Sequence, residues 1–275
     1  MAAGRTGHTD RMRPGHAYLD APGPLAFAHR GGHFDGLENT MAAFTNAVSL
    51  GYQYLETDAR ATADGQLLAF HDPTLDRVTD RTGVIAELPW RQVRAARVGG
   101  REPIPLLEDL VAAFPDARFN LDVKHPSAIA PLVRAIQRTG SLHRVCVTSF
   151  SDRRLAAVRA ALGPGLCTAM GPATIARLRT CSRSRLLRWL APRYPCVQVP
   201  DRWGLTSPAF VAAAQALGVQ VHVWTINDEP DMHRLINSGV NGIMTDQLHT
   251  LRDVLRSRGA WSSDAQHPPG RQPGA

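Results

Sequence analysis

The chain has 275 residues, of which 44% are hydrophobic and 20% are charged, and its formal net charge is +7. These values are typical of a globular protein with a full apolar core, built as one large α/β domain or two small ones. No apolar run is long enough to span a bilayer, and the basic N-terminus lacks the apolar stretch of a secretory signal. We therefore expect a cytoplasmic protein.

Residues 1–23 and 259–275 are rich in Gly, Pro, Ser and His and show no periodicity, which predicts flexible tails around a folded domain at residues 24–258. Within that domain, continuous apolar runs alternate with segments that carry helix caps. Such runs are typical of parallel strands whose outer face is covered by helices. The predicted strands are residues 25–28, 52–57, 119–123, 145–149, 167–170, 196–199, 219–225 and 242–245.

Four helices have recognisable ends. A side chain that accepts a hydrogen bond from a first-turn N–H group opens each helix, and a glycine follows its last turn. The predicted opening residues are Asn39, Ser151, Ser207 and Asp228, and the closing glycines are Gly51, Gly163, Gly218 and Gly239.

A short hairpin is predicted directly after the second strand. Residues 61–66, with Asp64 and Gly65 at their centre, join that strand to the apolar run 67–70. The link is too short for a parallel crossover, and Asp-Gly between two apolar runs favours a hairpin. Counting outward from the turn, His71 pairs near Asp58.

The predicted strands fit a closed (β/α)8 barrel (a TIM barrel) or an open doubly wound sheet. Polar side chains follow the carboxyl ends of strands throughout the chain. In an open sheet the outermost of these ends lie too far apart to share one ligand, whereas a closed barrel brings them all to one rim. The barrel is therefore favoured. The polar rim residues are His29, Glu56, Asp58, Asp122, Lys124, Ser149, Trp224, Asn227 and Asp246.

The later part of the chain contains a block of positive charge. Residues 153–200 include nine arginines and no acid. Such a block can contact nucleic acid or anionic lipid. It lacks interleaved aromatic residues apart from Trp189 and Tyr194, and it matches no nucleic-acid module, so we expect solvated helices and no nucleic-acid partner. A weak contact with a membrane surface through residues 153–193 is the alternative.

The four cysteines, Cys146, Cys167, Cys181 and Cys196, show neither a close C-x-x-C spacing nor a histidine array. Cys146 and Cys167 lie in apolar runs, where a thiol behaves as a small hydrophobic group. We therefore predict reduced, structural thiols rather than a zinc site or a disulfide framework.

Two pairs of charged residues stand at the ends of predicted strands. Glu56 and Asp58 are two residues apart and so share one face of a strand, and Asp122 and Lys124 repeat this spacing. Carboxylates that converge on a barrel mouth repel one another unless a cation neutralises them. Oxygen ligands favour Mg²⁺ or Ca²⁺ over a thiophilic metal. Ordinary ion pairs are the alternative.

Histidine, lysine and arginine complete the candidate site. His29 ends the first strand and the hairpin returns His71 to the same rim, which favours an acid–base pair. Lys124 is the only lysine in the chain. A specific role is therefore indicated, either contact with a phosphate oxygen or formation of a Schiff base. Arg30 offers a forked donor for phosphate, although it could equally belong to a turn.

Nine short motifs occur in an order that resembles the glycerophosphodiester phosphodiesterase family. They span roughly residues 25–257, and their succession is far more specific than any one of them. The motifs are His29-Arg30-Gly31, Glu38-Asn39-Thr40, Glu56-x-Asp58, Thr62-x-Asp64-Gly65, His71-Asp72, Asp122-x-Lys124, Ser149-Phe150, Trp224-Thr225-Ile226-Asn227 and Gly242-Ile243-x-Thr245-Asp246.

The resemblance implies a (β/α)8 barrel and a set of site roles. It implies His29 and His71 as general acid and base. The implied ligands of a divalent cation are Glu56, Asp58 and the acid on the lysine strand, Asp122. Asp122 departs from the family, which usually has glutamate there, so it binds the metal through water or weakens the site.

The resemblance also implies that Arg30 and Lys124 hold the phosphate and that Trp224 lines the alcohol pocket. Behind these residues we expect supporting side chains at Glu38, Asn39 and Ser149. The implied reaction is metal-dependent hydrolysis of a glycerophosphodiester to sn-glycerol 3-phosphate and an alcohol that the sequence does not identify.

Three other functions remain open at this stage. A lyase or a lysophospholipase-D-like enzyme would act on lipid phosphodiesters at a membrane surface and would need an apolar channel. A non-catalytic phosphate-binding barrel is expected to have lost a histidine or a ligand. A lysine-dependent aldolase barrel would explain Lys124 but would leave His29 and His71 without a role.

Overall fold

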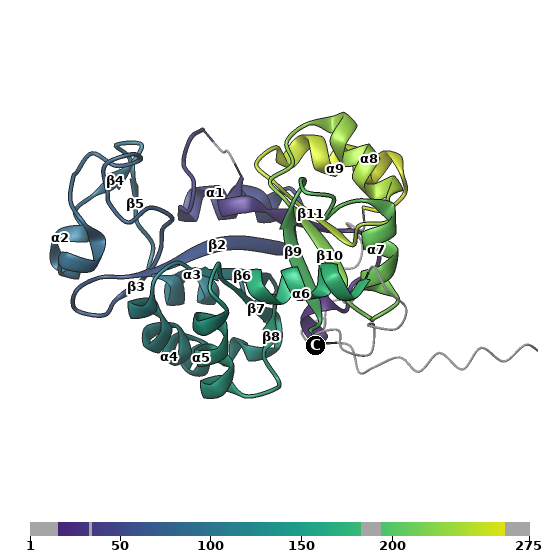
Figure 1. The fold of residues 1–275 in the computed structure, drawn as a ribbon. Helices are drawn as coiled ribbons and strands as arrows, with labels where there is room; N and C mark the ends of the chain where they lie inside the picture. The colour runs from purple at the N-terminus through teal and green to yellow at the C-terminus, as the bar shows by residue number, and fades with distance from the viewer. Residues whose placement is uncertain (1–15, 33–34, 183–193, 262–275) are drawn as a thin grey trace, which may run out of the picture.

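The structure, a computed structural model, describes residues 16–32, 35–182 and 194–261 (Figure 1). Within these residues, eight parallel strands form a barrel surrounded by helices. The strands are β1 (Leu25–Ala28), β2 (Tyr54–Ala61), β6 (Arg118–Val123), β7 (Val145–Thr148), β8 (Cys167–Thr168), β9 (Cys196–Pro200), β10 (Gln220–Trp224) and β11 (Gly242–Thr245). Their spatial order is β8-β7-β6-β2-β1-β11-β10-β9.

The barrel is nearly closed, and its weakest seam lies between β8 and β9. An isolated parallel bridge pairs Ala169 with Cys196, and the backbone N–H of Met170 donates to the carbonyl of Cys196 at 3.1 Å. The predicted closed barrel is therefore confirmed in preference to an open sheet.

Strand residues alternate between two apolar clusters, as the pleat of a strand requires. In β7, Val145 and Val147 pack in the large cluster formed with the outer helices. Cys146 between them belongs to a smaller cluster with Phe27 and Tyr54. The alternation places this smaller cluster on the inner face of the barrel.

The covering helices are α1 (Met41–Ser49), α3 (Leu107–Ala113), α4 (Ile129–Thr139), α5 (Asp152–Leu162), α6 (Pro172–Ser182), α7 (Pro208–Gln215), α8 (Glu229–Asn237) and α9 (Leu248–Ser257). The starts predicted for α5 and α7 are confirmed. Ser151 accepts from the backbone N–H of Arg154, and Ser207 accepts from that of Phe210, each at 3.3 Å.

The cap predicted at Asn39 is wrong. Helix α1 begins one residue later, because Oγ1 of Thr40 accepts the first-turn hydrogen bond from the backbone N–H of Ala43 at 3.2 Å. Asn39 adopts a left-handed backbone conformation with φ 57°. Its side chain turns to the second strand, where its amide donates to Asp58 at 2.9 Å.

The predicted hairpin is present and forms the first part of a larger arm. Strand β2 continues past the barrel and pairs antiparallel with β3 (Leu67–Ala69). The arm continues through a 3-10 turn (Ile85–Glu87), α2 (Trp90–Val93) and the small sheet of β4 (Arg97–Val98) and β5 (Glu102–Pro103). In Figure 1 these elements project to one side of the barrel. They enclose an apolar cluster of their own, centred on Phe70 and Leu75.

Part of each predicted tail packs on the barrel. A 3-10 turn at Ala17–Leu19 places Tyr18 in the inner cluster, where only 1% of Tyr18 is exposed and its carbonyl accepts from the Tyr54 hydroxyl at 2.8 Å. Trp261 lies against Tyr52, with ring centroids 5.1 Å apart. The tail boundaries predicted at residues 23 and 259 thus differ from the packing seen. Residues 1–15 and 262–275 lie outside the described residues.

The arginine block is only partly described. Arg154 donates to Ser149 at 2.7 Å, and Arg159 lies over the ring of Tyr194 at 4.8 Å, so both make internal contacts. The four arginines between residues 183 and 193 lie outside the described residues. Over the described ranges, no helix combines the length and the apolar character that crossing a membrane requires.

Candidate active site

The first strand ends in a tight turn at the mouth of the barrel. Arg30 has a left-handed backbone with φ 52°, and Gly31 has φ 82°. A Cβ atom on Gly31 would lie 2.9 Å from the Cβ of Ala43 in α1, so glycine is needed for the turn to pack on this helix. The turn directs the backbone N–H of Arg30 to Oε2 of Glu56 at 3.0 Å.

Three buried carboxylates lie beneath this turn. Glu56 and Asp58 point from β2, and Asp122, which is in register with Asp58, points from β6; their exposed fractions are 5%, 1% and 4%. Lys124 bridges two of them, because its Nζ lies 2.9 Å from Asp58 and 2.6 Å from Asp122. Nε of Arg30 lies 3.3 Å from Asp58.

The nearby cations do not satisfy all three acids. Burial and the charge of Asp58 raise the pKa of Glu56 to about 7, and burial also raises the pKa of Asp122. Burial acts in the same direction on Asp58, but Lys124 and Arg30 hold its pKa below the ordinary value. Oδ1 of Asp122 is buried without a hydrogen-bond partner. These acids therefore offer buried oxygens with the chemistry of a hard-cation site.

The three carboxylates are not gathered tightly around one point. In the described part of the chain, the three acids do not bring three oxygens within 4.8 Å of one another. Lys124 lies between Asp58 and Asp122 and forms an ion pair with each of them. Asp122 binds Lys124 through Oδ2, whereas its Oδ1 has no hydrogen-bond partner and is open to a cation.

His29 is oriented by an acid from the last strand. Its Nδ1 donates to Oδ1 of Asp246 at 2.7 Å, and its Nε2 lies 3.9 Å from Glu56. The other oxygen of Asp246 accepts from the amide of Asn227 at 2.9 Å. Burial lowers the pKa of His29, but the Asp246 hydrogen bond and the charge of Glu56 outweigh burial, so this pKa is raised.

His71 comes from the arm. The backbone N–H of Phe70 donates to the carbonyl of Asp58 at 2.9 Å, which confirms the predicted return of His71 to this region. Nδ1 of His71 donates to Asp72 at 2.6 Å, and Arg77 also binds Asp72, at 2.5 Å. Burial lowers the pKa of His71 despite the charge of Asp58.

The three residues expected behind the site make different contacts. Glu38 accepts a hydrogen bond from Arg30 at 3.0 Å and one from Arg77 at 2.6 Å, and so links the turn to the arm. Asn39 donates to Asp58, as described above. Ser149 is further back: it donates to the carbonyl of Val123 at 2.8 Å and accepts from Arg154.

These elements enclose one polar cavity of about 160 Å³. The residues lining it include every predicted catalytic, metal and substrate residue, namely His29, Arg30, Glu56, Asp58, His71, Asp122, Lys124 and Trp224. The sequence analysis did not assign site roles to Asp72, Arg77 or Asp246. Asp72 and Asp246 belong to motifs identified in the sequence, and those motifs could have indicated a role for them. No motif includes Arg77.

An apolar cavity of about 370 Å³ adjoins the polar one. The two cavities share Phe150 and Trp224, whose rings meet edge to face at 5.6 Å. Met170 and Ile175 line the apolar side, and Arg179 lies on its border. Trp224, predicted to line the alcohol pocket, thus stands between the acids and an apolar space.

Known proteins with similar sequences indicate the family to which the chain belongs. The family model described as "Glycerophosphoryl diester phosphodiesterase family" matches residues 29–250. A Mycobacterium tuberculosis protein named as a probable glycerophosphodiester phosphodiesterase is 41% identical over 261 residues, which cover 92% of this chain and 98% of the relative. A human lysophospholipase D is 29% identical over 278 residues, covering 84% and 85% of the two chains.

Solved structures agree on the fold. A Silicibacter pomeroyi protein assigned to the same class of enzyme superposes with a TM-score of 0.75 at 22% identity, covering 90% of this chain and 98% of its own. The family match spans most of the chain and includes both histidines and all three acids of the cavity. The chain therefore belongs to the glycerophosphoryl diester phosphodiesterase family and is a phosphoric diester hydrolase.

Proposed function

We propose that this enzyme hydrolyses glycerophosphodiesters to sn-glycerol 3-phosphate and a free alcohol, using His29 and His71 as its acid and base. The observation that carries this proposal is the pair of histidines at one cavity, each bound through Nδ1 to a carboxylate. This bond fixes the ring and leaves Nε2 for proton transfer. The Mycobacterium tuberculosis relative supports the substrate class.

The surroundings of the two histidines favour different roles. Asp246 and Glu56 favour the protonated form of His29, which suits donation of a proton to the departing alcohol. The charge of Asp72 is offset by Arg77, and burial favours the neutral form of His71. Neutral His71 suits removal of a proton from water or from a neighbouring hydroxyl of the substrate.

A divalent cation fits the acids of the cavity. Glu56 and Asp58 would hold it, with Asp122 as a direct or water-mediated third ligand. The buried, unpartnered Oδ1 of Asp122 and the raised pKa of Glu56 support this role, and the all-oxygen donor set suits Mg²⁺ or Ca²⁺ alike. When bound, such a cation supplies neutralisation of phosphate charge and polarisation of the phosphoryl group.

Arg30 and Lys124 supply the remaining positive charge for the phosphate. Asp58 and Asp122 outweigh burial and raise the pKa of Lys124 to about 12. A lysine that stays protonated donates hydrogen bonds well but cannot attack a carbonyl, which argues against the aldolase alternative. Glu38 orients Arg30, and Asn39 orients Asp58.

Release of sn-glycerol 3-phosphate tests the proposal directly. Glycerophosphocholine, glycerophosphoethanolamine and glycerophosphoglycerol are supplied to enzyme in chelator and after addition of Mg²⁺ or Ca²⁺. We expect turnover only with a cation. Full turnover in excess chelator would contradict the role of the acids, and no release from any substrate would contradict the substrate class.

A second candidate function, cleavage of lysophospholipids, is favoured by the apolar cavity. The apolar cavity adjoins the polar cavity at Trp224, and the alcohol or acyl portion of a substrate would extend into it. Met170 and Ile175 supply apolar side chains to this cavity, and the human relative is named a lysophospholipase D. The membrane contact considered for residues 153–193 would serve such a substrate.

One substitution separates the two functions. Ala173 and Ala176 are both exposed residues of α6, and of the two only Ala176 lines the apolar cavity. If lysophospholipids are substrates, Ala176→Trp should lower turnover of lysophosphatidylcholine without lowering that of glycerophosphocholine, and the control Ala173→Trp should change neither. Equal effects on both substrates would contradict an acyl-binding role for the cavity.

A further inference from the structure

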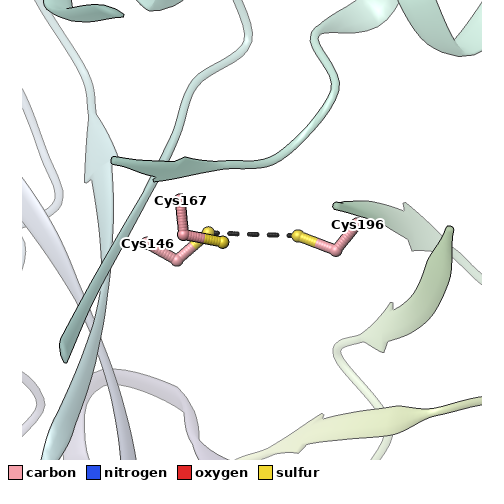
Figure 2. Close-up of side chains that lie close together, drawn as sticks. All are labelled: Cys146, Cys167 and Cys196. Carbon is pink, nitrogen blue, oxygen red and sulfur yellow. Dashed lines mark hydrogen bonds between the residues drawn. The ribbon is translucent and has the colours of Figure 1, made fainter. Parts of the chain in front are cut away.

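Three cysteines from three neighbouring strands meet inside the barrel (Figure 2). Cys146 lies on β7, Cys167 on β8 and Cys196 on β9, and their sulfur atoms all lie within 4.8 Å of one another. Their exposed fractions are 0%, 1% and 0%. The sequence predicted reduced, structural thiols, because no close C-x-x-C spacing or histidine array accompanies them and two of them lie in apolar runs. The fold brings them together.

The sulfur spacing matches a shared metal better than a disulfide. Sγ of Cys146 lies 3.9 Å from Sγ of Cys196. A disulfide requires about 2.05 Å between its sulfurs. Metal–sulfur bonds of about 2.3 Å place two sulfurs about 3.8 Å apart around a tetrahedral ion and about 4.0 Å apart around a trigonal one. The sulfurs of Cys146 and Cys196 therefore already stand at the separation that a bound ion would impose.

Two polar atoms beside the cluster are buried without a hydrogen-bond partner. They are the Tyr18 hydroxyl and Nδ1 of His222, in side chains that are 1% and 0% exposed. Tyr18 packs in the same inner apolar cluster as the three cysteines, and burial raises the pKa of its hydroxyl. A buried hydroxyl without a partner is costly, and a thiolate would accept its hydrogen bond.

The cluster lies across the weakest seam of the barrel. Cys146 and Cys167 are in register on β7 and β8. Cys196 is on β9, and among the described residues β9 is joined to the segment of β8 by the bridge to Ala169 and the backbone bond from Met170. A ligand held by all three sulfurs would therefore cross-link the strands where the backbone pairing is poorest.

We propose that Cys146, Cys167 and Cys196 bind one thiophilic cation of the zinc and cadmium class, and that this ion closes the barrel between β8 and β9. Each thiol loses its S–H proton on binding, so three protons leave per ion. With a divalent ion, the three thiolates leave a net charge of −1, which the Tyr18 hydroxyl stabilises by donating to one sulfur. This site is separate from the carboxylate cavity, whose oxygens suit harder ions.

Cadmium titration of the full-length, reduced protein tests the proposal, because thiolate-to-cadmium charge transfer absorbs in the ultraviolet and carboxylate ligands give no such band. We expect a band that saturates at about one equivalent, and a melting temperature that rises with it. Cys196→Ala and Cys167→Ala should lose both responses. The matched control Cys181→Ala removes a buried thiol on α6 outside the cluster and should keep both, as should Glu56→Gln.

Since the cluster is buried, a second titration is made by refolding the protein from denaturant with Cd²⁺ present. A saturable band in either titration supports the site. The proposal is overturned if correctly folded, reduced protein gives no such band in either titration, or if Cys196→Ala retains it. It is also overturned if the protein as purified has two thiols fewer than its four cysteines allow and gives no band after reduction, because the cluster would then be a disulfide pair.

Discussion

Lys124→Met is expected to destabilise the metal-free protein strongly, because Lys124 is the cation shared by two buried acids. Its Nζ lies 2.9 Å from Asp58 and 2.6 Å from Asp122. With an effective dielectric constant of about 20, each contact corresponds to about 6 kcal/mol of Coulomb attraction. Desolvation of the charges offsets much of this sum, so the free energy of unfolding should fall by about 3–5 kcal/mol.

The effect has a defined dependence on pH and on cations. Because Asp58 and Asp122 raise the pKa of Lys124 to about 12, its stabilisation is fully present below the unfolded-state pKa of about 10.4 and is lost as the pH rises through 12. Denaturant unfolding near neutral pH in chelator therefore measures the whole effect. Mg²⁺ or Ca²⁺ should then restore more stability to the variant than to the parent, because the vacated position favours a cation.

Lys124→Arg is the matched control, since it keeps the charge and changes the donor geometry. This variant should retain most of the free energy of unfolding and lose turnover. The planar guanidinium of arginine cannot replace the compact ammonium group of lysine between two acids. An unchanged free energy of unfolding for Lys124→Met in chelator would refute the electrostatic account of this site.

Other substitutions address single groups of the site. His29→Ala and His71→Ala should each lower kcat by about 10²–10⁴ with unchanged circular dichroism, and near-parental kcat would remove that histidine from the mechanism. Asp246→Asn keeps a side chain of the same shape but removes the charge that raises the pKa of His29. The alkaline limb of the pH–rate profile should therefore move to lower pH, and an unmoved limb would contradict His29 as the acid. Asp122→Asn should raise the cation concentration for half-maximal activity and Asp122→Glu should lower it; if neither changes it, Asp122 acts only as the partner of Lys124.

The barrel could be predicted because the buried strands are largely apolar runs with polar residues at or near their carboxyl ends. Side chains such as Glu56 and Asp58 are costly to bury, so their positions at strand ends indicated where the site had to be. The return of His71 followed from counting residues across a short hairpin. These inferences depend on patterns of neighbouring residues, which can be read directly from the sequence.

Contacts that join distant segments could not be predicted in the same way. Arg77 binds Asp72 and Glu38 only because the arm folds back over the mouth, and no pattern near residue 77 indicates this. Asn39 resembled a helix cap, but Asp58 and Thr57 compete for its side chain and Thr40 caps the helix instead. Tyr18 lies in a segment with the composition of a tail, yet the inner face of the barrel buries it.

The separate apolar core of the arm places the two histidines of the proposed acid–base pair in different parts of the fold. His29 belongs to the barrel, whereas His71 belongs to an arm built around Phe70 and Leu75. A small unit of this kind can open locally at a lower free energy than the whole domain. Heating should therefore abolish catalysis at a temperature where far-ultraviolet circular dichroism still reports an intact barrel, and cooling should restore it. For this enzyme, the temperature of inactivation is expected to measure the stability of the arm.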